Sequence, residues 1–139
     1  MTRIDFHTNI ADKLSYACRL ARKAYGAGGK LVVLAEDDAQ AAAVNHGLWT
    51  VGETDFLPHA MAGDELAAHS PIIVTASLDG ALPHYDMLVN LTRSAPHDLD
   101  RFQRVFEIIA VDEEDAAAGR KRYVAYKQQS YPLTHFVAS

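Results

Sequence analysis

A segment near the C-terminus combines an aromatic side chain with positive charges at helical spacing. Four of its residues fall at positions i, i+4, i+7 and i+11, so a helix would place them on one face: Ala116, Arg120, Tyr123 and Lys127. A tyrosine ring between two cations suits a peptide that carries an apolar side chain and a carboxylate. A solvated helix face, with acids at its start and bases near its end, explains the same residues and remains an open alternative.

Two large aromatic residues, Trp49 and Phe56, form a second feature. They flank a short turn-like stretch, residues 51–54, that contains Gly52. Large aromatic side chains at the ends of elements either close a hydrophobic core or anchor a protein interface, where tryptophan is favoured. The residues alone leave both interpretations open.

The motifs of nucleotide-binding and hydrolytic enzymes are missing. Glycines precede Lys30, but Leu31 follows where a phosphate loop needs Ser or Thr, and the stretch leads into a strand rather than a helix. The first predicted strand-to-helix turn, residues 7–10, has no glycine to let a pyrophosphate approach. There is no Gly-x-Ser-x-Gly elbow. We therefore predict no catalytic residue. A small nucleotide-dependent or hydrolytic enzyme remains the alternative, on fold analogy alone.

Neither a metal site nor a disulfide is predicted. The seven histidines lack the close spacing of a helical zinc motif, and helix capping accounts for the acidic run at 36–38. The single cysteine, Cys18, cannot form an intramolecular disulfide, and its position beside alanines predicts a small buried side chain. We expect the chain to need no cofactor.

The composition is that of an ordinary globular protein. A chain of 139 residues, 49% hydrophobic and 22% charged, fits one domain covering residues 1–139. The N-terminus lacks the apolar core of a signal peptide and no stretch could span a membrane, so we expect a cytoplasmic protein. The formal net charge of −5 argues against tight, direct nucleic-acid binding, although bases cluster locally at 120–127.

Alternating strand and helix patterns predict an α/β fold. Apolar runs predict strands at residues 3–7, 31–35, 71–77, 85–91, 106–111 and 133–137, with a short one at 54–59. Helices are predicted to begin near Asn9 and Asp37, and to cover 96–104 and 116–129. Continuous aliphatic runs such as 31–35 are typical of strands buried on both faces of a sheet. The order of elements therefore favours a mainly parallel sheet flanked by helices.

Several segments, taken in order along the chain, resemble the chi subunit family of bacterial DNA polymerase III. They are Leu31–Ala35 followed by Glu36-Asp37, then Gly47-Leu48-Trp49, then Phe56-Leu57-Pro58-His59 with Ala62-Gly63, and lastly the basic and aromatic stretch 120–127. The similarity spans nearly the whole chain, and its weight lies in the ordered combination. It implies a Rossmann-like three-layer domain that acts as an accessory subunit without catalytic activity.

The resemblance also implies protein partners. Chi proteins join the clamp-loader assembly through the psi subunit, and they bind the acidic, phenylalanine-ended C-terminal tail of single-stranded DNA-binding protein. Carried over by position, the tail pocket would contain Arg120, Tyr123, Lys127, Ile109 and Leu133. Trp49 and Phe56 would belong to a separate surface that meets psi or, alternatively, a helicase.

One position departs from the family pattern. The family often has lysine directly after the tyrosine, and here that residue is Val124. A valine cannot pair with a carboxylate, so either Arg120 and Lys127 suffice, helped by Lys121, or tail affinity is weaker. Losing one charged hydrogen bond costs about 1.5–3 kcal/mol, or about ten- to a hundredfold in affinity.

Overall fold

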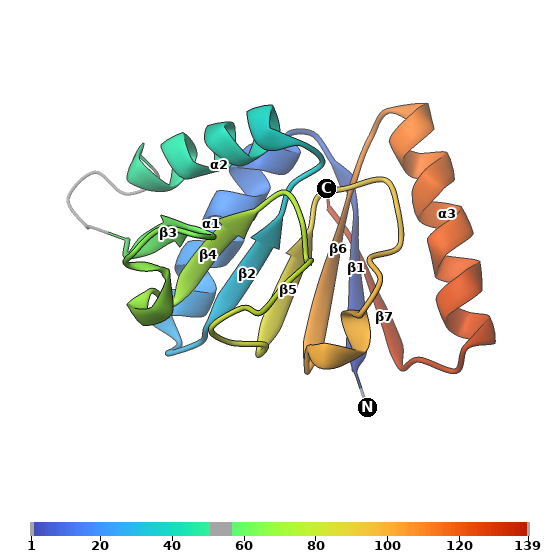
Figure 1. The fold of residues 1–139 in the computed structure, drawn as a ribbon. Coiled ribbons are helices and arrows are strands. Elements are labelled where there is room, and N and C mark those ends of the chain that lie inside the picture. The colour runs from blue at the N-terminus through green and yellow to red at the C-terminus, as the bar shows by residue number, and fades with distance from the viewer. Residues whose placement is uncertain (1, 51–56, 139) are drawn as a thin grey trace.

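A seven-stranded parallel sheet forms the centre of the computed structural model, which describes residues 2–50 and 57–138 (Figure 1). From one edge to the other, the strands are β3 (His59–Met61), β4 (Ile72–Thr75), β2 (Leu31–Leu34), β5 (Met87–Asn90), β6 (Arg104–Ala110), β1 (Arg3–Ile10) and β7 (Leu133–Val137). Every pairing between these strands is parallel. The predicted α/β fold is confirmed, with a sheet that is parallel throughout.

Helices on both faces of the sheet complete a three-layer, Rossmann-like arrangement. They are α1 (Lys13–Gly26), α2 (Asp38–Thr50) and α3 (Glu113–Gln128). On one face, α1 and α2 pack against alternate strand side chains such as Val33 and Ile108. On the other face, Tyr126 of α3 joins an apolar cluster that contains Phe6. All four residues of β2 are buried, which explains its continuous aliphatic sequence.

The β1–β7 edge presents different side chains to the two faces of the sheet. Phe6 and its parallel partner His135 lie on the α3 side. One residue further along, His7 and its partner Phe136 lie on the α1 side, because successive side chains of a strand alternate. Among the strands, α1 packs mainly on β2 and β6 rather than on the outer strand β7.

The predicted start of the first helix is wrong. We expected Asn9 to cap it, but β1 continues to Ile10 and α1 begins at Lys13. The cap is Asp12, whose side chain accepts a hydrogen bond from the backbone N–H of Ser15 at 3.2 Å. Asn9 has a left-handed φ of 62°, a conformation that ends the strand rather than starting a helix.

The predicted helix at 96–104 is also wrong. Only Leu99–Arg101 form a single 3-10 turn, since Asp98 has a φ of 62° and β6 already begins at Arg104. The strand predicted at 54–59 corresponds to β3, which begins at His59, and residues 54–56 lie outside the described part of the chain. The last strand, β7, has the predicted bounds.

A buried ionic cluster fastens α3 to the sheet. The Glu107 carboxylate on β6 accepts hydrogen bonds from Arg122 Nη2 (2.9 Å), Tyr126 Oη (2.7 Å) and Asn90 Nδ2 (2.9 Å). All four side chains belong to buried residues. Burial and the adjacent Glu107 charge raise the pKa of Tyr126, which keeps its phenol protonated as a donor. The cluster fixes which side of α3 faces β6, and so positions the residues on the neighbouring part of the helix.

Candidate functional site

A groove lies between α3 and the part of the sheet formed by β6, β1 and β7, which are adjacent in Figure 1. We call it the α3 groove; it has a volume of about 570 Å³ and mostly apolar walls. The helix contributes Ala116, Gly119, Arg120, Tyr123 and Val124. The strands and the segment after β6 contribute Phe6, Thr8, Asn9, Ile109, Ala110, Val111 and His135.

The Tyr123 ring lies between the core and the α3 groove. It packs edge-on against Phe6, with ring centroids 5.1 Å apart, and its centroid lies 6.3 Å from that of His135. The residue is half-buried and also contacts the apolar cluster beneath α3. One side of the ring is therefore held by packing, while the ring still lines the groove.

Arg120 is a charged residue of the groove that is already paired. Its Nη2 lies 2.7 Å from Glu113 Oε1, and the two side chains are 65% and 82% exposed. An exposed ion pair of this kind contributes little to stability, because water and salt screen it. Another carboxylate could therefore replace Glu113 as the partner of Arg120 at small cost.

The structure brings together three of the five residues predicted for the tail pocket. Ile109, Arg120 and Tyr123 line the α3 groove, and Ala116 of the same predicted helix face lines it too. Leu133 packs in the apolar cluster with Tyr123 but is not part of the groove lining. Lys127 is exposed on α3, one turn beyond Tyr123, and also lies outside the lining.

Several groove residues escaped sequence reasoning because they come from the other end of the chain. Phe6 and Asn9 belong to β1, which reaches the groove only because β1 lies between β6 and β7 in the sheet. His135 follows from the same order, and its Nε2 lies 2.7 Å from Thr8 Oγ1.

Val124 was singled out as a departure from the family pattern, and it lines the groove as an exposed apolar side chain.

Trp49, the first residue of the second predicted surface, lies near the end of α2. Its side chain is exposed, and its ring packs edge-on against His59 at 4.8 Å. Its predicted companion, Phe56, lies outside the described residues. The exposure of Trp49 argues against the alternative that it closes the core.

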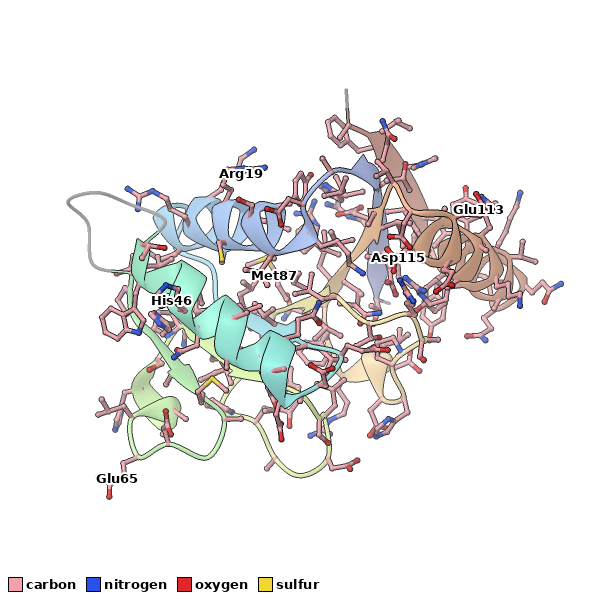
Figure 2. All side chains as sticks on the ribbon, turned by 90° about the horizontal axis from the view of Figure 1, so that it is seen from above. Arg19, His46, Glu65, Met87, Glu113 and Asp115 are labelled. Atoms are coloured by element: carbon pink, nitrogen blue, oxygen red, sulfur yellow. The ribbon has the colours of Figure 1, made fainter. Side chains whose placement is uncertain are left out.

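The carboxyl ends of the strands, where α/β sheets commonly bind ligands, hold paired charges instead. Asp115 lies at the start of α3 (Figure 2). Its Oδ1 is 3.1 Å from Lys13 Nζ and 3.2 Å from Arg93 Nε. Burial disfavours its ionisation, but a hydrogen bond from the Ala110 N–H and the Lys13 charge outweigh it and lower the pKa of Asp115. Lys13 and Arg93 therefore both face an ionised carboxylate. Neither is an unpaired cation that could bind the phosphates of a nucleotide.

The remaining chemistry-bearing groups are the single cysteine and the side chains that could act as metal ligands. Cys18 is buried, and burial raises the pKa of its thiol to about 11, so it is not a reactive thiolate at neutral pH. Among residues 2–50 and 57–138, no cluster of His, Cys, Asp or Glu side chains could hold a metal ion. No helix within those ranges is long and apolar enough to cross a membrane.

The fold and the site define the class of this protein. It is a parallel α/β domain with an apolar groove near one edge of its sheet. The solved structure of T4 UvsW has the same architecture, with a TM-score of 0.72 over 99% of this chain. This chain covers 41% of the UvsW chain at 8% sequence identity, so the likeness concerns the fold alone.

The sequence gives the family. Residues 1–134 match the model of the family described as DNA polymerase III chi subunit, HolC, and the chain belongs to this family. The DNA polymerase III subunit chi of Pseudomonas aeruginosa is 33% identical over 139 residues, covering 96% of this chain and 94% of the relative. The chi subunit of Haemophilus influenzae is 26% identical, covering 85% and 82%, and that of Escherichia coli is 23% identical, covering 84% and 79%. The resemblance seen in the sequence motifs is confirmed.

Proposed function

We propose that this DNA polymerase III subunit is an accessory subunit that holds two other proteins together and has no catalytic activity of its own. One partner is the acidic, phenylalanine-ended C-terminal tail of single-stranded DNA-binding protein. The other is the psi subunit, which links the chain to the clamp-loader assembly. The observation that carries the proposal is the α3 groove, where Arg120 and Tyr123 of one helix meet Ile109 of a strand.

The α3 groove suits both chemical parts of such a tail. Tyr123 and Ile109 offer an apolar surface to the terminal phenylalanine, and burying apolar area gains about 25 cal/mol per Å². Arg120 lines the same groove, and its guanidinium can pair with the tail carboxylate as it now pairs with Glu113. On tail binding, Arg120 would exchange its exposed ion pair with Glu113 for one with the tail carboxylate. The phenylalanine ring of the tail would become buried in the groove.

Val124 makes apolar contact a larger part of tail binding, and charge a smaller part, than a lysine at this position would. Together with Val111 it gives the groove two apolar side chains that are each more than half exposed, at 54% and 56%. Lys127 lies outside the lining, so it attracts the tail from a distance at which salt screens the charge. We therefore expect binding to depend less on salt than in a relative with lysine in place of Val124.

Replacing Arg120 by alanine should weaken tail binding by about five- to tenfold, which corresponds to about 1–1.4 kcal/mol. The reason is the loss of the guanidinium that lines the α3 groove beside Tyr123. The measurement is a fluorescence-anisotropy titration with a labelled peptide that ends in acidic residues and phenylalanine. Equal affinities of the variant and the wild type, or no binding by the wild type, would remove the tail assignment.

Two further variants control for charge. Lys30→Ala makes the same change in net charge at an exposed residue between α1 and β2, and it should leave the affinity unchanged. Glu113→Gln frees Arg120 from its present partner, so it should strengthen tail binding by about two- to fivefold. A weakening by Glu113→Gln would mean that the Glu113–Arg120 pair shapes the groove rather than competing with the tail.

Replacing Trp49 by alanine should weaken association with the psi subunit by about tenfold or more, as is usual for an interface tryptophan. Trp49 is exposed, and we propose that it forms this surface together with Phe56; a helicase could use the same surface. Tail affinity should not change, since Trp49 is not among the residues that line the α3 groove. Calorimetric titration with psi measures the effect. An unfolded variant would mean that Trp49 is structural, and the psi assignment would fail.

A further inference from the structure

A second groove lies on the opposite face of the same sheet edge. It has a volume of about 520 Å³; residues of α1 line one wall, and residues of β6, β1 and β7 line the rest. We call it the α1 groove. Four cations line it: Arg3, Arg19, Lys23 and Arg104. Asp5 is the carboxylate in the lining, so the groove carries a net positive charge in a chain whose formal charge is −5.

Asp5 pairs with two of the cations that line the α1 groove. Its Oδ2 lies 2.6 Å from Arg104 Nε, and its Oδ1 lies 3.5 Å from Arg3 Nε. Burial disfavours the charged carboxylate, but hydrogen bonds from Thr134 and Arg104 and the two positive charges outweigh it and lower the pKa of Asp5. The carboxylate contacts each guanidinium through Nε, and neither arginine pairs with a second carboxylate among residues 2–50 and 57–138, so their terminal Nη groups can face another anion.

The other two cations stand one turn apart on α1. Arg19 and Lys23 are exposed, and neither forms an ion pair within the described parts of the chain. Figure 2 shows Arg19 on the side of α1 that faces away from α2. Its guanidinium lies 5.9 Å from the ring centroid of Tyr16, which lines the same groove. The wall of the α1 groove therefore offers, beside an aromatic ring, two positive charges that form no ion pair with the described residues.

Aromatic side chains complete the α1 groove. The His7 ring packs near two of them, with its centroid 5.5 Å from that of Tyr16 and 5.6 Å from that of Phe136. Burial lowers the pKa of His7, assisted by the charges of Arg104 and Lys23 and opposed by Asp5, so the ring is neutral at pH 7. Phe136 on the outer strand is 55% exposed. An incoming planar group would find a neutral, apolar surface there.

We propose that the α1 groove binds single-stranded nucleic acid, with phosphates at the cations and a base against Phe136. Sites of this type combine a positively charged groove with rings on which bases stack without sequence preference. An acidic peptide would use the cations but would gain nothing specific from the exposed ring. The inference goes beyond the protein contacts proposed above and does not depend on them.

The net negative charge of the chain implies that this contact is weak and sensitive to salt. Neutralising about three phosphates gives a slope of about −2 for log affinity against log salt with a single strand. The contact therefore differs from the tight, direct nucleic-acid binding that the composition argues against. At physiological salt the contact would assist a strand that is already held nearby, whereas at low salt it should bind a free strand from solution.

The test is an anisotropy titration of the full chain with a labelled oligothymidylate of about 20 nucleotides in about 50 mM salt, where electrostatic contacts are strong. Arg19→Ala with Lys23→Ala should lower the affinity at least about tenfold. Lys121→Ala with Lys127→Ala, which makes the same change in net charge on α3, should change it less than twofold. Phe136→Ala should lower it about fivefold, because one stacked base is lost.

Several results would overturn the proposal. One is equal weakening by the two double variants, which would indicate an unspecific charge effect; another is no binding by the wild type. A third is poly-glutamate binding as tightly as the oligonucleotide with Phe136→Ala affecting neither, which would assign the groove to acidic peptides. If Phe136→Ala changes the melting temperature, Phe136→Leu keeps the apolar volume while removing the ring, and the same fivefold loss is expected from it.

Discussion

Replacing Glu107 by alanine should lower the free energy of unfolding by about 3–5 kcal/mol, the cost of removing one partner from a buried ion pair. The substitution leaves the guanidinium of Arg122, a residue only 4% exposed, without its carboxylate. It also removes the acceptor of the Tyr126 hydroxyl and of the Asn90 amide. Denaturant unfolding measures the loss as a lower midpoint with an unchanged slope.

The matched control is Glu113→Ala on the exposed part of α3. Glu113 also pairs with an arginine of that helix, at 2.7 Å, but both side chains are mostly exposed. We expect a loss of about 0–1 kcal/mol from this control, as for other surface pairs. If Glu107→Ala and Glu113→Ala cost the same, the buried cluster does not hold α3 against the sheet, and the origin of the α3 groove needs another explanation.

Replacing Gly119 by valine should destabilise the protein by about 1–3 kcal/mol, the usual cost of overfilling a tight contact. A Cβ at Gly119 would lie 2.8 Å from Ile109 Cδ1 and 3.0 Å from its Cγ2. The glycine therefore allows α3 to approach β6 closely enough for Tyr123 and Ile109 to share a groove. Thermal and denaturant unfolding measure the effect.

Gly26→Val is the control for this substitution. Gly26 ends α1, and a Cβ there would meet no heavy atom within 4 Å outside its immediate neighbours. Its effect should stay near the change in helix propensity, a few tenths of a kcal/mol. The double variant Gly119→Val with Ile109→Ala should lose less stability than the sum of the two single losses, since the two residues are in contact. Additive losses in the double variant would contradict the close approach of α3 to β6.

Sequence patterns predicted the strands of the sheet better than the segments that connect them. The aliphatic run at 31–35 and the terminal strand at 133–137 were found because each has a composition typical of a strand. Residues 96–104 have apolar side chains at helical spacing, but a left-handed Asp98 limits them to one 3-10 turn. The apolar residues of this segment still reach the core, so periodicity identified burial while giving the wrong backbone conformation.

The candidate site was predictable only where it lies on one element. Arg120 and Tyr123 share a helix face, so their spacing predicted that they meet. Phe6 and His135 reach the same groove through a strand order that no local pattern encodes. Arg122 lies inside the basic run at 120–127 and would be expected on the surface, yet Glu107, fifteen residues earlier, pairs with it in the interior.

Heteronuclear NMR of the labelled chain, titrated with the acidic, phenylalanine-ended tail peptide, tests the central claim most directly. A tail seated between α3 and the strands should shift the amides of Ile109, Gly119, Tyr123 and His135 together. The amide resonances of Arg19 and Lys23, which lie on the far side of the sheet, should not change their chemical shifts. Shifts confined to α1 and Phe136, or spread evenly over the surface, would contradict the account.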